Sequence, residues 1–193
     1  MPEIQAVILA GGRSRRMGRD KALLPFGGYS TLAQYQYERL RKIFPKVYIS
    51  TKIDKFPFRA PLILDQEEES SPMIALASIL KTIEPEAVFI LGVDLPFVDK
   101  SIIHSLLQSF ADNPKAEAVV PVTPAGAEPL CTIYTRRLLP RIEDSLNLGE
   151  HRLQSLFETE KILRVPFKET TSFANLNRPE EYEKAVRRVR SEE

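Results

Sequence analysis

Short apolar runs alternate with amphipathic segments along almost the whole chain, and this alternation limits the folds that the chain can adopt. Apolar runs predict strands, and segments with apolar residues at helical spacing predict helices. The predicted strands cover residues 4–9, 47–51, 62–64, 87–91, 118–122, 130–134 and 162–165, and the predicted helices cover residues 30–44, 73–83, 100–110, 136–146, 152–157 and 179–189. This order is typical of an α/β domain with a mainly parallel sheet.

The size and composition of the chain predict a single enzyme domain over residues 1–193. Hydrophobic residues make up 43% of the sequence and charged residues 27%, as in ordinary globular proteins. The net charge of +1 favours binding neither to nucleic acid nor to a membrane surface. A single cysteine, Cys131, lies in an apolar run, and we expect it to be buried in a protein of a reducing compartment. The sequence has no membrane-spanning stretch or signal-peptide layout, so we expect a cytoplasmic protein.

The segment after the first predicted strand combines glycine with many cations. Leu9 and Ala10 lead into Gly11 and Gly12, and arginine or lysine follows at positions 13, 15, 16, 19 and 21. Glycine lets the backbone approach a ligand closely, and both guanidinium groups and backbone amides bind phosphate oxygens. The segment therefore predicts a site for several phosphates in a row.

Spacing excludes two common phosphate-binding motifs in this segment. A Walker A loop needs glycine followed by Lys and then Ser or Thr, but Gly18 is followed by Arg19 and Asp20. The dinucleotide motif G-x-G-x-x-G is not found here either. The pattern is L-A-G-G-x-S-x-R-M-G-x-D-K over residues 9–21. It resembles the signature loop of nucleotidyltransferases with a glycosyltransferase-A-like fold. Its Asp20-Lys21 ending is most similar to that of the molybdenum cofactor guanylyltransferase (MobA-like) family.

This resemblance implies a fold and a reaction. The fold is a three-layer α/β/α sandwich with a Rossmann-like, mainly parallel sheet, as in nucleotide-diphospho-sugar transferases. The reaction transfers GMP from GTP to the terminal phosphate of molybdopterin, releases pyrophosphate and forms molybdopterin guanine dinucleotide. The partners so implied are GTP, molybdopterin with or without molybdenum, molybdenum-insertion proteins and acceptor molybdoenzymes. The resemblance also implies that Arg16 and Lys21 neutralise phosphate charge, and that Leu9, Ala10, Gly11 and Gly12 bind the nucleotide.

A carboxylate stands just beyond the most apolar predicted strand, residues 87–91. Ligands of open α/β sheets bind at the carboxyl ends of strands, which is where Asp94 is expected to lie. From the residues alone, Asp94 either binds Mg²⁺ beside a triphosphate or caps the turn before Pro96. The arrangement Asp94-Leu95-Pro96 resembles the metal-binding segment of the family. We therefore expect Asp94 to be a catalytic metal ligand, with Mn²⁺ as the alternative to Mg²⁺.

Asp65 follows another predicted strand, residues 62–64. The resemblance implies that Asp65 accepts hydrogen bonds from the N1–H and N2–H₂ edge of guanine, while the residues alone also fit a simple turn carboxylate. The next segment departs from the family pattern G-P-L-A-G, because Ser71, Met73 and Ala75 replace its first Gly, its Leu and its second Gly. Ser71 would be strained if the backbone there required a positive φ.

The C-terminal half carries a second motif, F-x-N-x-N-x-P-E-E over residues 173–181. It resembles a family segment that implies acceptor binding by Asn175 and Asn177. Asparagine both donates and accepts hydrogen bonds, which suits a pterin ring or a phosphate. The alternative for either residue is a cap of the last predicted helix. Glu128 stands before Pro129 where the family often has His. We expect residues 1–100 to bind the nucleotide and residues 101–193 to bind the acceptor.

Three other functions compete with guanylyl transfer. A CTP-using molybdopterin cytidylyltransferase shares the phosphate loop, and Ser71 and Met73 weaken the preference for guanine. A sugar-phosphate or polyol-phosphate nucleotidyltransferase also shares this loop, but the asparagine motif argues against it. A non-catalytic protein that delivers the cofactor would not need both the loop and Asp94.

Overall fold

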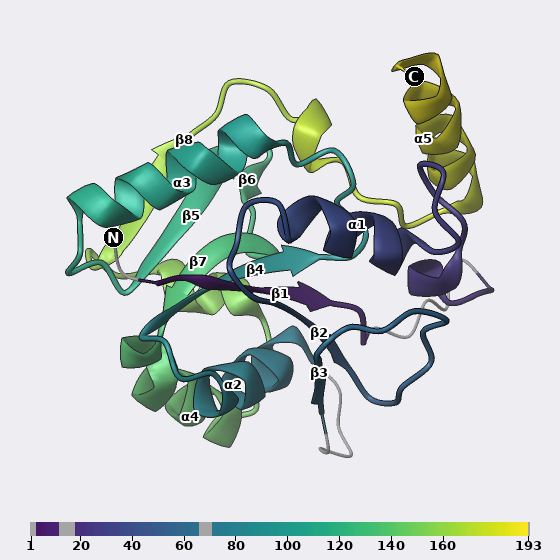
Figure 1. The fold of residues 1–193 in the computed structure, drawn as a ribbon. Helices are drawn as coiled ribbons and strands as arrows, with labels where there is room; N and C mark the ends of the chain where they lie inside the picture. Colours follow the sequence, from purple (N-terminus) through teal and green to yellow (C-terminus); the bar gives the residue numbers. More distant parts are fainter. Residues whose placement is uncertain (1–2, 12–17, 66–70, 193) are drawn as a thin grey trace.

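A single eight-stranded sheet forms the centre of the molecule in a computed structural model that describes residues 3–11, 18–65 and 71–192 (Figure 1). The strand order is β3-β2-β1-β4-β7-β5-β6, and β8 pairs with β5. The strands are β1 (Gln5–Leu9), β2 (Val47–Thr51), β3 (Leu62–Leu64), β4 (Ala87–Gly92), β5 (Ala118–Thr123), β6 (Gly126–Ala127), β7 (Cys131–Thr135) and β8 (Ile162–Pro166).

The sheet is parallel in its first half and mixed in its second. Strands β3, β2, β1 and β4 are parallel neighbours, whereas β7 is antiparallel to both β4 and β5. Only residues 124–130 connect β5 to β7, and a parallel crossover needs a dozen residues or more. This short connection explains why β7 runs antiparallel within the predicted, mainly parallel sheet. The carboxyl ends of β1, β3, β4 and β5 consequently lie at one edge of the sheet.

Helices cover both faces of the sheet, which confirms the predicted three-layer α/β/α arrangement. Helices α1 and α3 lie over one face, and α2 and α4 lie over the other (Figure 1). The α-helices are α1 (Leu32–Leu40), α2 (Pro72–Thr82), α3 (Lys100–Asp112), α4 (Leu139–Asn147) and α5 (Pro179–Glu192). The 3₁₀ turns are η1 (Lys21–Leu23), η2 (Arg136–Leu138), η3 (Leu153–Phe157) and η4 (Thr171–Phe173).

Three of the predicted helices show the largest differences from the structure, while α2, α3 and α5 differ from their predicted bounds by one to three residues at an end. Helix α1 ends at Leu40 instead of residue 44, and the chain continues as a turn in which Ile43 N donates to Leu40 O at 2.9 Å. Helix α4 starts at Leu139 instead of residue 136, since Pro140 has no N–H and fits only the first turn of a helix. The helix predicted over residues 152–157 is the 3₁₀ turn η3.

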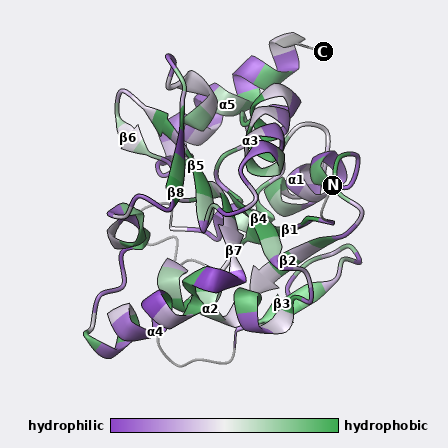
Figure 2. Cartoon of the chain, turned by 90° about the vertical axis from the view of Figure 1, so that its left-hand side faces the viewer, coloured by the Kyte–Doolittle hydropathy of each residue, from purple (hydrophilic) through white to green (hydrophobic). Residues whose placement is uncertain are grey.

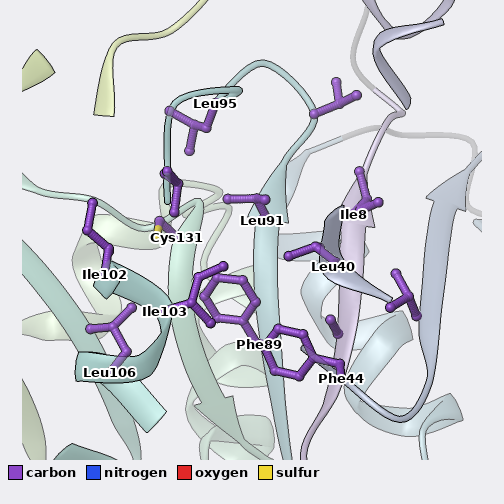
Figure 3. Packing of buried hydrophobic residues seen from close by; sticks show 14 of the residues in the cluster. Ile8, Leu40, Phe44, Phe89, Leu91, Leu95, Ile102, Ile103, Leu106 and Cys131 are labelled. Carbon is purple, nitrogen blue, oxygen red and sulfur yellow. The ribbon is translucent and has the colours of Figure 1, made fainter. Parts of the chain in front are cut away.

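Buried side chains join each face of the sheet to its helices. On one face, Phe89 of β4 stacks on Phe44, with ring centroids 5.3 Å apart, and Leu106 of α3 belongs to the same cluster (Figure 3). Cys131 is fully buried there, as predicted, and burial raises the pKa of its thiol. The central strands are mostly hydrophobic, while hydrophilic residues gather on the outer sides of helices and loops (Figure 2). In the described part of the chain, no helix has the length and apolar character needed to span a membrane.

Candidate nucleotide-binding site

The backbone at the end of β1 leads into the centre of the carboxyl edge. The carbonyl of Leu9 accepts a hydrogen bond from Val93 N at 3.0 Å, and Ala10 N donates to Ser50 O at 2.9 Å. Because β1 lies between β2 and β4, these bonds hold Ala10 and Gly11 between the ends of the two neighbouring strands. The carboxyl end of β1 therefore lies beside that of β4, the strand that precedes Asp94. Three predicted nucleotide-binding residues lie there, namely Leu9, Ala10 and Gly11.

Part of the predicted phosphate loop is outside the described residues. Gly12 and Arg16 both lie in that part, so their nucleotide-binding and catalytic roles stay predictions. Beyond it, Gly18 has φ of +64°, a left-handed conformation that favours glycine. Asp20 then starts the turn η1, where its Oδ1 accepts a hydrogen bond from Ala22 N at 3.0 Å.

Lys21, Asp94 and Asn177 meet at the start of η1. The Lys21 ammonium donates to Asp94 Oδ2 at 2.7 Å and to Asn177 Oδ1 at 3.0 Å. The side chains of Lys21 and Asp94 are each 15% exposed, so their charges interact in a partly shielded site. Two predicted catalytic residues and one predicted acceptor-binding residue are thus in direct contact. Asn175 lies close by in the chain and is exposed.

Helix α1 holds the turn that carries Asp94. Gln36 is fully buried, and its Nε2 donates to Leu95 O at 3.0 Å and to Val93 O at 3.4 Å. Arg39, one helical turn later, donates to Pro96 O at 2.6 Å and also to Val98 O. We did not expect either role from the sequence. The available signal was a glutamine on the apolar face of a helix, where an unpaired amide would be costly.

Two other segments pack around the same turn. Leu176 N donates to Asp94 O at 3.0 Å, and Gly92 N donates to Leu130 O at 2.7 Å. A Cβ atom at Gly92 would lie 2.8 Å from Asp94 Oδ1 and 3.3 Å from Leu130 Cβ, so a larger residue here would force the Asp94 carboxylate to shift. The C-terminal segment and the loop before β7 therefore both contribute to the placement of Asp94.

Asp65 lies at the other end of the same edge. It follows β3 directly, and its backbone N–H extends the pairing with β2 by donating to Thr51 O at 3.0 Å. The residue is only 9% exposed. Three strand spacings of about 4.8 Å place the ends of β3 and β4 about 14 Å apart. An extended nucleotide can span such an edge, with its base toward Asp65 and its phosphates toward Asp94.

Ser71 starts α2 without backbone strain. Its φ of −141° is in the extended region, and its Oγ accepts a hydrogen bond from Ile74 N at 3.1 Å. The positive φ that would have made Ser71 unfavourable is therefore not present, and a serine N-cap replaces the family glycine. His151 Nδ1 lies 3.1 Å from the same Oγ. The connector after α4 thus touches the predicted base segment, which the sequence did not indicate.

Glu128 lies in the loop before β7. Its backbone N–H bonds to Pro121 O at 3.0 Å, and Thr123 Oγ1 donates to its Oε1 at 3.4 Å. Partial burial raises the pKa of the Glu128 carboxyl, although the bond from Thr123 opposes this effect. An ionisable carboxyl group therefore occupies the position before Pro129 where the family often has histidine.

The carboxylates at this edge fit a metal ion that is shared with a substrate. Within residues 3–11, 18–65 and 71–192, no group of three or more His, Cys, Asp or Glu side chains is arranged to hold a metal by itself. Magnesium commonly binds through one or two carboxylates together with substrate phosphates and water. Asp94, a carboxylate already facing a cation, fits this kind of shared site.

Comparisons with known proteins agree with this geometry. Residues 6–165 match the model of the MobA-like NTP transferase domain. A molybdenum cofactor guanylyltransferase from Campylobacter jejuni is 40% identical over 184 residues, which cover 94% of this chain and 95% of that protein. One from Helicobacter pylori is 31% identical over 191 residues, with 95% and 92% coverage.

Solved structures share the fold at lower identity. Molybdopterin-guanine dinucleotide biosynthesis protein A from Archaeoglobus fulgidus superposes with a TM-score of 0.82 at 19% identity, covering 97% of this chain and 100% of that one. A CMP:2-keto-3-deoxy-manno-octonic acid synthetase in complex with CTP has the same TM-score of 0.82 at 16% identity, with 98% and 100% coverage. Taken with the family match and the meeting of Lys21 with Asp94, these similarities show that the chain belongs to the MobA-like NTP transferase family and is a nucleotidyltransferase.

Proposed function

We propose that the protein transfers GMP from GTP to the terminal phosphate of molybdopterin, forming molybdopterin guanine dinucleotide and pyrophosphate. The observation that carries this proposal is the contact of Lys21 with both Asp94 and Asn177 at the carboxyl edge of the sheet. The contact brings together one residue from each of three motifs: Lys21 of the phosphate loop, Asp94 of the metal-binding segment and Asn177 of the asparagine segment. The relatives named guanylyltransferases match nearly the whole length of the chain.

The chemistry needs positioned charges more than a protein nucleophile. An oxygen of the acceptor phosphate forms a bond to the α-phosphorus of GTP, while the bond to the bridging oxygen breaks and pyrophosphate leaves with the electron pair. Lys21, and Arg16 by the family resemblance, stabilise the negative charge on the phosphates. Mg²⁺ bound by Asp94 and nucleotide phosphates would supply Lewis acidity. Backbone amides at Ala10, Gly11 and Gly12 would orient the phosphates.

The two substrates are assigned to the two halves of the chain. Residues 1–100 bind the nucleotide, with Asp65 accepting hydrogen bonds from the guanine edge. Residues 101–193 bind the acceptor, to which Asn175 and Asn177 contribute. Because Asn177 also contacts Lys21, we place it where the acceptor phosphate meets the nucleotide.

Nucleotide selectivity and product formation test this function. Calorimetric titration with GTP, CTP and ATP in the presence of Mg²⁺ should show binding of GTP and at least roughly tenfold weaker binding of the other two. Incubation of GTP with molybdopterin should then yield the guanine dinucleotide. A preference for CTP would instead identify a cytidylyltransferase. Absence of transfer from any nucleotide would support a delivery protein.

A further inference from the structure

Lys55 lies between β2 and β3 and contacts both sides of the predicted phosphate loop. Its ammonium donates to Ala10 O at 3.0 Å and to Asp20 Oδ2 at 2.5 Å. Ala10 precedes the glycine pair, and Asp20 follows the cation-rich residues. A side chain that is distant in sequence thus links the two ends of the segment expected to bind phosphate.

The environment of Lys55 differs from that of a surface ion pair. Its side chain is only 15% exposed, and its ammonium lies 5.6 Å from the centre of the Phe56 ring. Exposed ion pairs contribute little because water and salt screen them. The Lys55 ammonium is partly shielded and bonds to both Ala10 O and Asp20 Oδ2. Removing the ammonium therefore leaves each of these acceptors with one donor fewer.

A chain of contacts leads from Lys55 to the reacting groups. Asp20 Oδ2 accepts a hydrogen bond from Lys55, and Asp20 Oδ1 accepts one from Ala22 N. The second bond caps the start of the turn η1. The first residue of η1 is Lys21, and its ammonium bonds to Asp94. Movement of Asp20 would therefore displace Lys21, although Lys55 itself need not touch the substrate.

Charge gives Lys55 a second effect. Asp20 brings a carboxylate into a segment that must attract a triphosphate, and an uncompensated carboxylate there would repel the phosphates. Lys55 neutralises it at 2.5 Å. Placement and neutralisation both depend on the same ammonium group.

We propose that Lys55 is a positioning residue for the nucleotide, which holds Ala10 and Asp20 together and thereby places Lys21 for the triphosphate. This inference rests on the proposed nucleotidyl transfer. It predicts that Lys55 affects binding of the nucleotide more than binding of the acceptor.

The test compares Lys55→Met, Lys55→Arg and the double variant Asp20→Asn/Lys55→Met by steady-state kinetics and thermal unfolding. Lys55→Met should raise the KM for GTP by roughly tenfold and lower kcat, with a smaller change in the KM for molybdopterin. The double variant should recover part of the loss, because its asparagine side chain keeps an acceptor for Ala22 N but carries no charge. Lys55→Arg keeps the charge and should be nearer to wild type than Lys55→Met.

Arg141→Met provides the matched control, since Arg141 forms a partly shielded ion pair with Glu117 at 2.8 Å. Glu117 precedes β5, at the opposite edge of the sheet, so this variant should lose stability without a change in the KM for GTP. If Lys55→Met does not fold, Lys55→Gln is judged by the same criterion.

An unchanged KM for GTP in the Lys55 variants would overturn the proposal. A double variant no better than Lys55→Met would overturn the second effect of Lys55, the neutralisation of Asp20. If wild type binds GTP but transfers nothing, guanylyl transfer fails while calorimetric GTP affinity still tests Lys55. If wild type binds no nucleotide, both proposals fail.

Discussion

The ends of β4 and β1 lie side by side, but different forces hold them. The turn after β4 is held mainly through its own backbone groups, which bond to buried Gln36, to Arg39, to the amide of Leu176 and to the carbonyl of Leu130. Beyond the end of β1, Asp20 and Lys21 each form an ion pair through the side chain, Asp20 with Lys55 and Lys21 with Asp94.

This difference separates two tasks within one site. Hydrogen bonds inside the protein depend little on salt, so the position of Asp94 should hold before any substrate binds. Ion pairs that are partly exposed respond to salt and to new charges. A triphosphate would compete for Lys21, so we expect the β1 end to change its contacts during binding and the β4 end to keep them.

The substitution Asp94→Asn should have the largest effect. It removes the carboxylate that would bind Mg²⁺ but keeps the backbone carbonyl that bonds to Leu176 N. Turnover of GTP should fall by about a hundredfold or more, with a melting temperature close to that of wild type. Asp99→Asn is the control, because asparagine also caps a helix and α3 should remain intact. Retained turnover, or unfolding of Asp94→Asn, would contradict the comparison.

Lys21→Met should follow, with roughly a hundredfold loss in kcat/KM for GTP. The variant should also show a weaker dependence of GTP binding on salt than wild type, since one cation fewer meets the phosphates. Steady-state kinetics measure the first effect, and titration calorimetry at low and high salt measures the second. Lys81→Met removes an exposed pair with Glu143 and should leave both unchanged. An unaltered salt dependence in Lys21→Met would place the triphosphate elsewhere.

The substitution Gln36→Leu removes the hydrogen bonds from α1 to the turn after β4, and it should mainly reduce stability. It leaves the buried carbonyls of Val93 and Leu95 without this donor, at a cost of about 1–3 kcal/mol in the free energy of unfolding. Urea denaturation at two salt concentrations should give the same loss in each. Gln34→Leu, on the same helix with an exposed partner, should cost less. A loss that disappears in high salt would mean that charge holds this turn too.

Glu128→Gln should produce the smallest effect, which depends on pH. Burial raises the folded-state pKa of Glu128, so its protonated form is favoured and its contribution to stability is lost as pH rises through that raised value. The variant should therefore gain in melting temperature relative to wild type as pH rises from about 4 to about 7, across and above the ordinary glutamate pKa.

Glu150→Gln supplies a control of opposite sign. Hydrogen bonds from Arg152 lower the pKa of Glu150 to about 2, so the wild-type side chain contributes to stability above the ordinary glutamate pKa. This variant should lose melting temperature relative to wild type as pH rises. The same sign for both variants would contradict the assigned causes.

The local sequence predicted the strands well where neighbouring residues alone determine where a strand begins and ends. Strands β2 and β3 have the predicted bounds, since each is a short apolar run with polar or proline-containing flanks. The strand β6 was missed because it contains only Gly126 and Ala127, which carry no apolar alternation. The predicted mainly parallel sheet is confirmed, and the short loop between β5 and β7 accounts for the antiparallel placement of β7.

The site divides in the same way between motif and tertiary contact. Lys21, Asp94 and Asn177 belong to motifs that the sequence displays, and the structure brings the three side chains together. Gln36 and Lys55 act across long sequence separations, on Leu95 and Asp20, and no spacing rule links such pairs. They become visible only when helix α1 and the β2–β3 segment are placed against the strand ends.

The contacts of residues 176 and 177 have a consequence for protein synthesis. The strands, and the turns carrying Lys21 and Asp94, are made before residue 170, but the amide of Leu176 and the side chain of Asn177 leave the ribosome later. A nascent chain could therefore form its sheet while its nucleotide site is still incomplete. The site reaches its final form only when this late segment has docked, because Leu176 then bonds to Asp94 and Asn177 to Lys21.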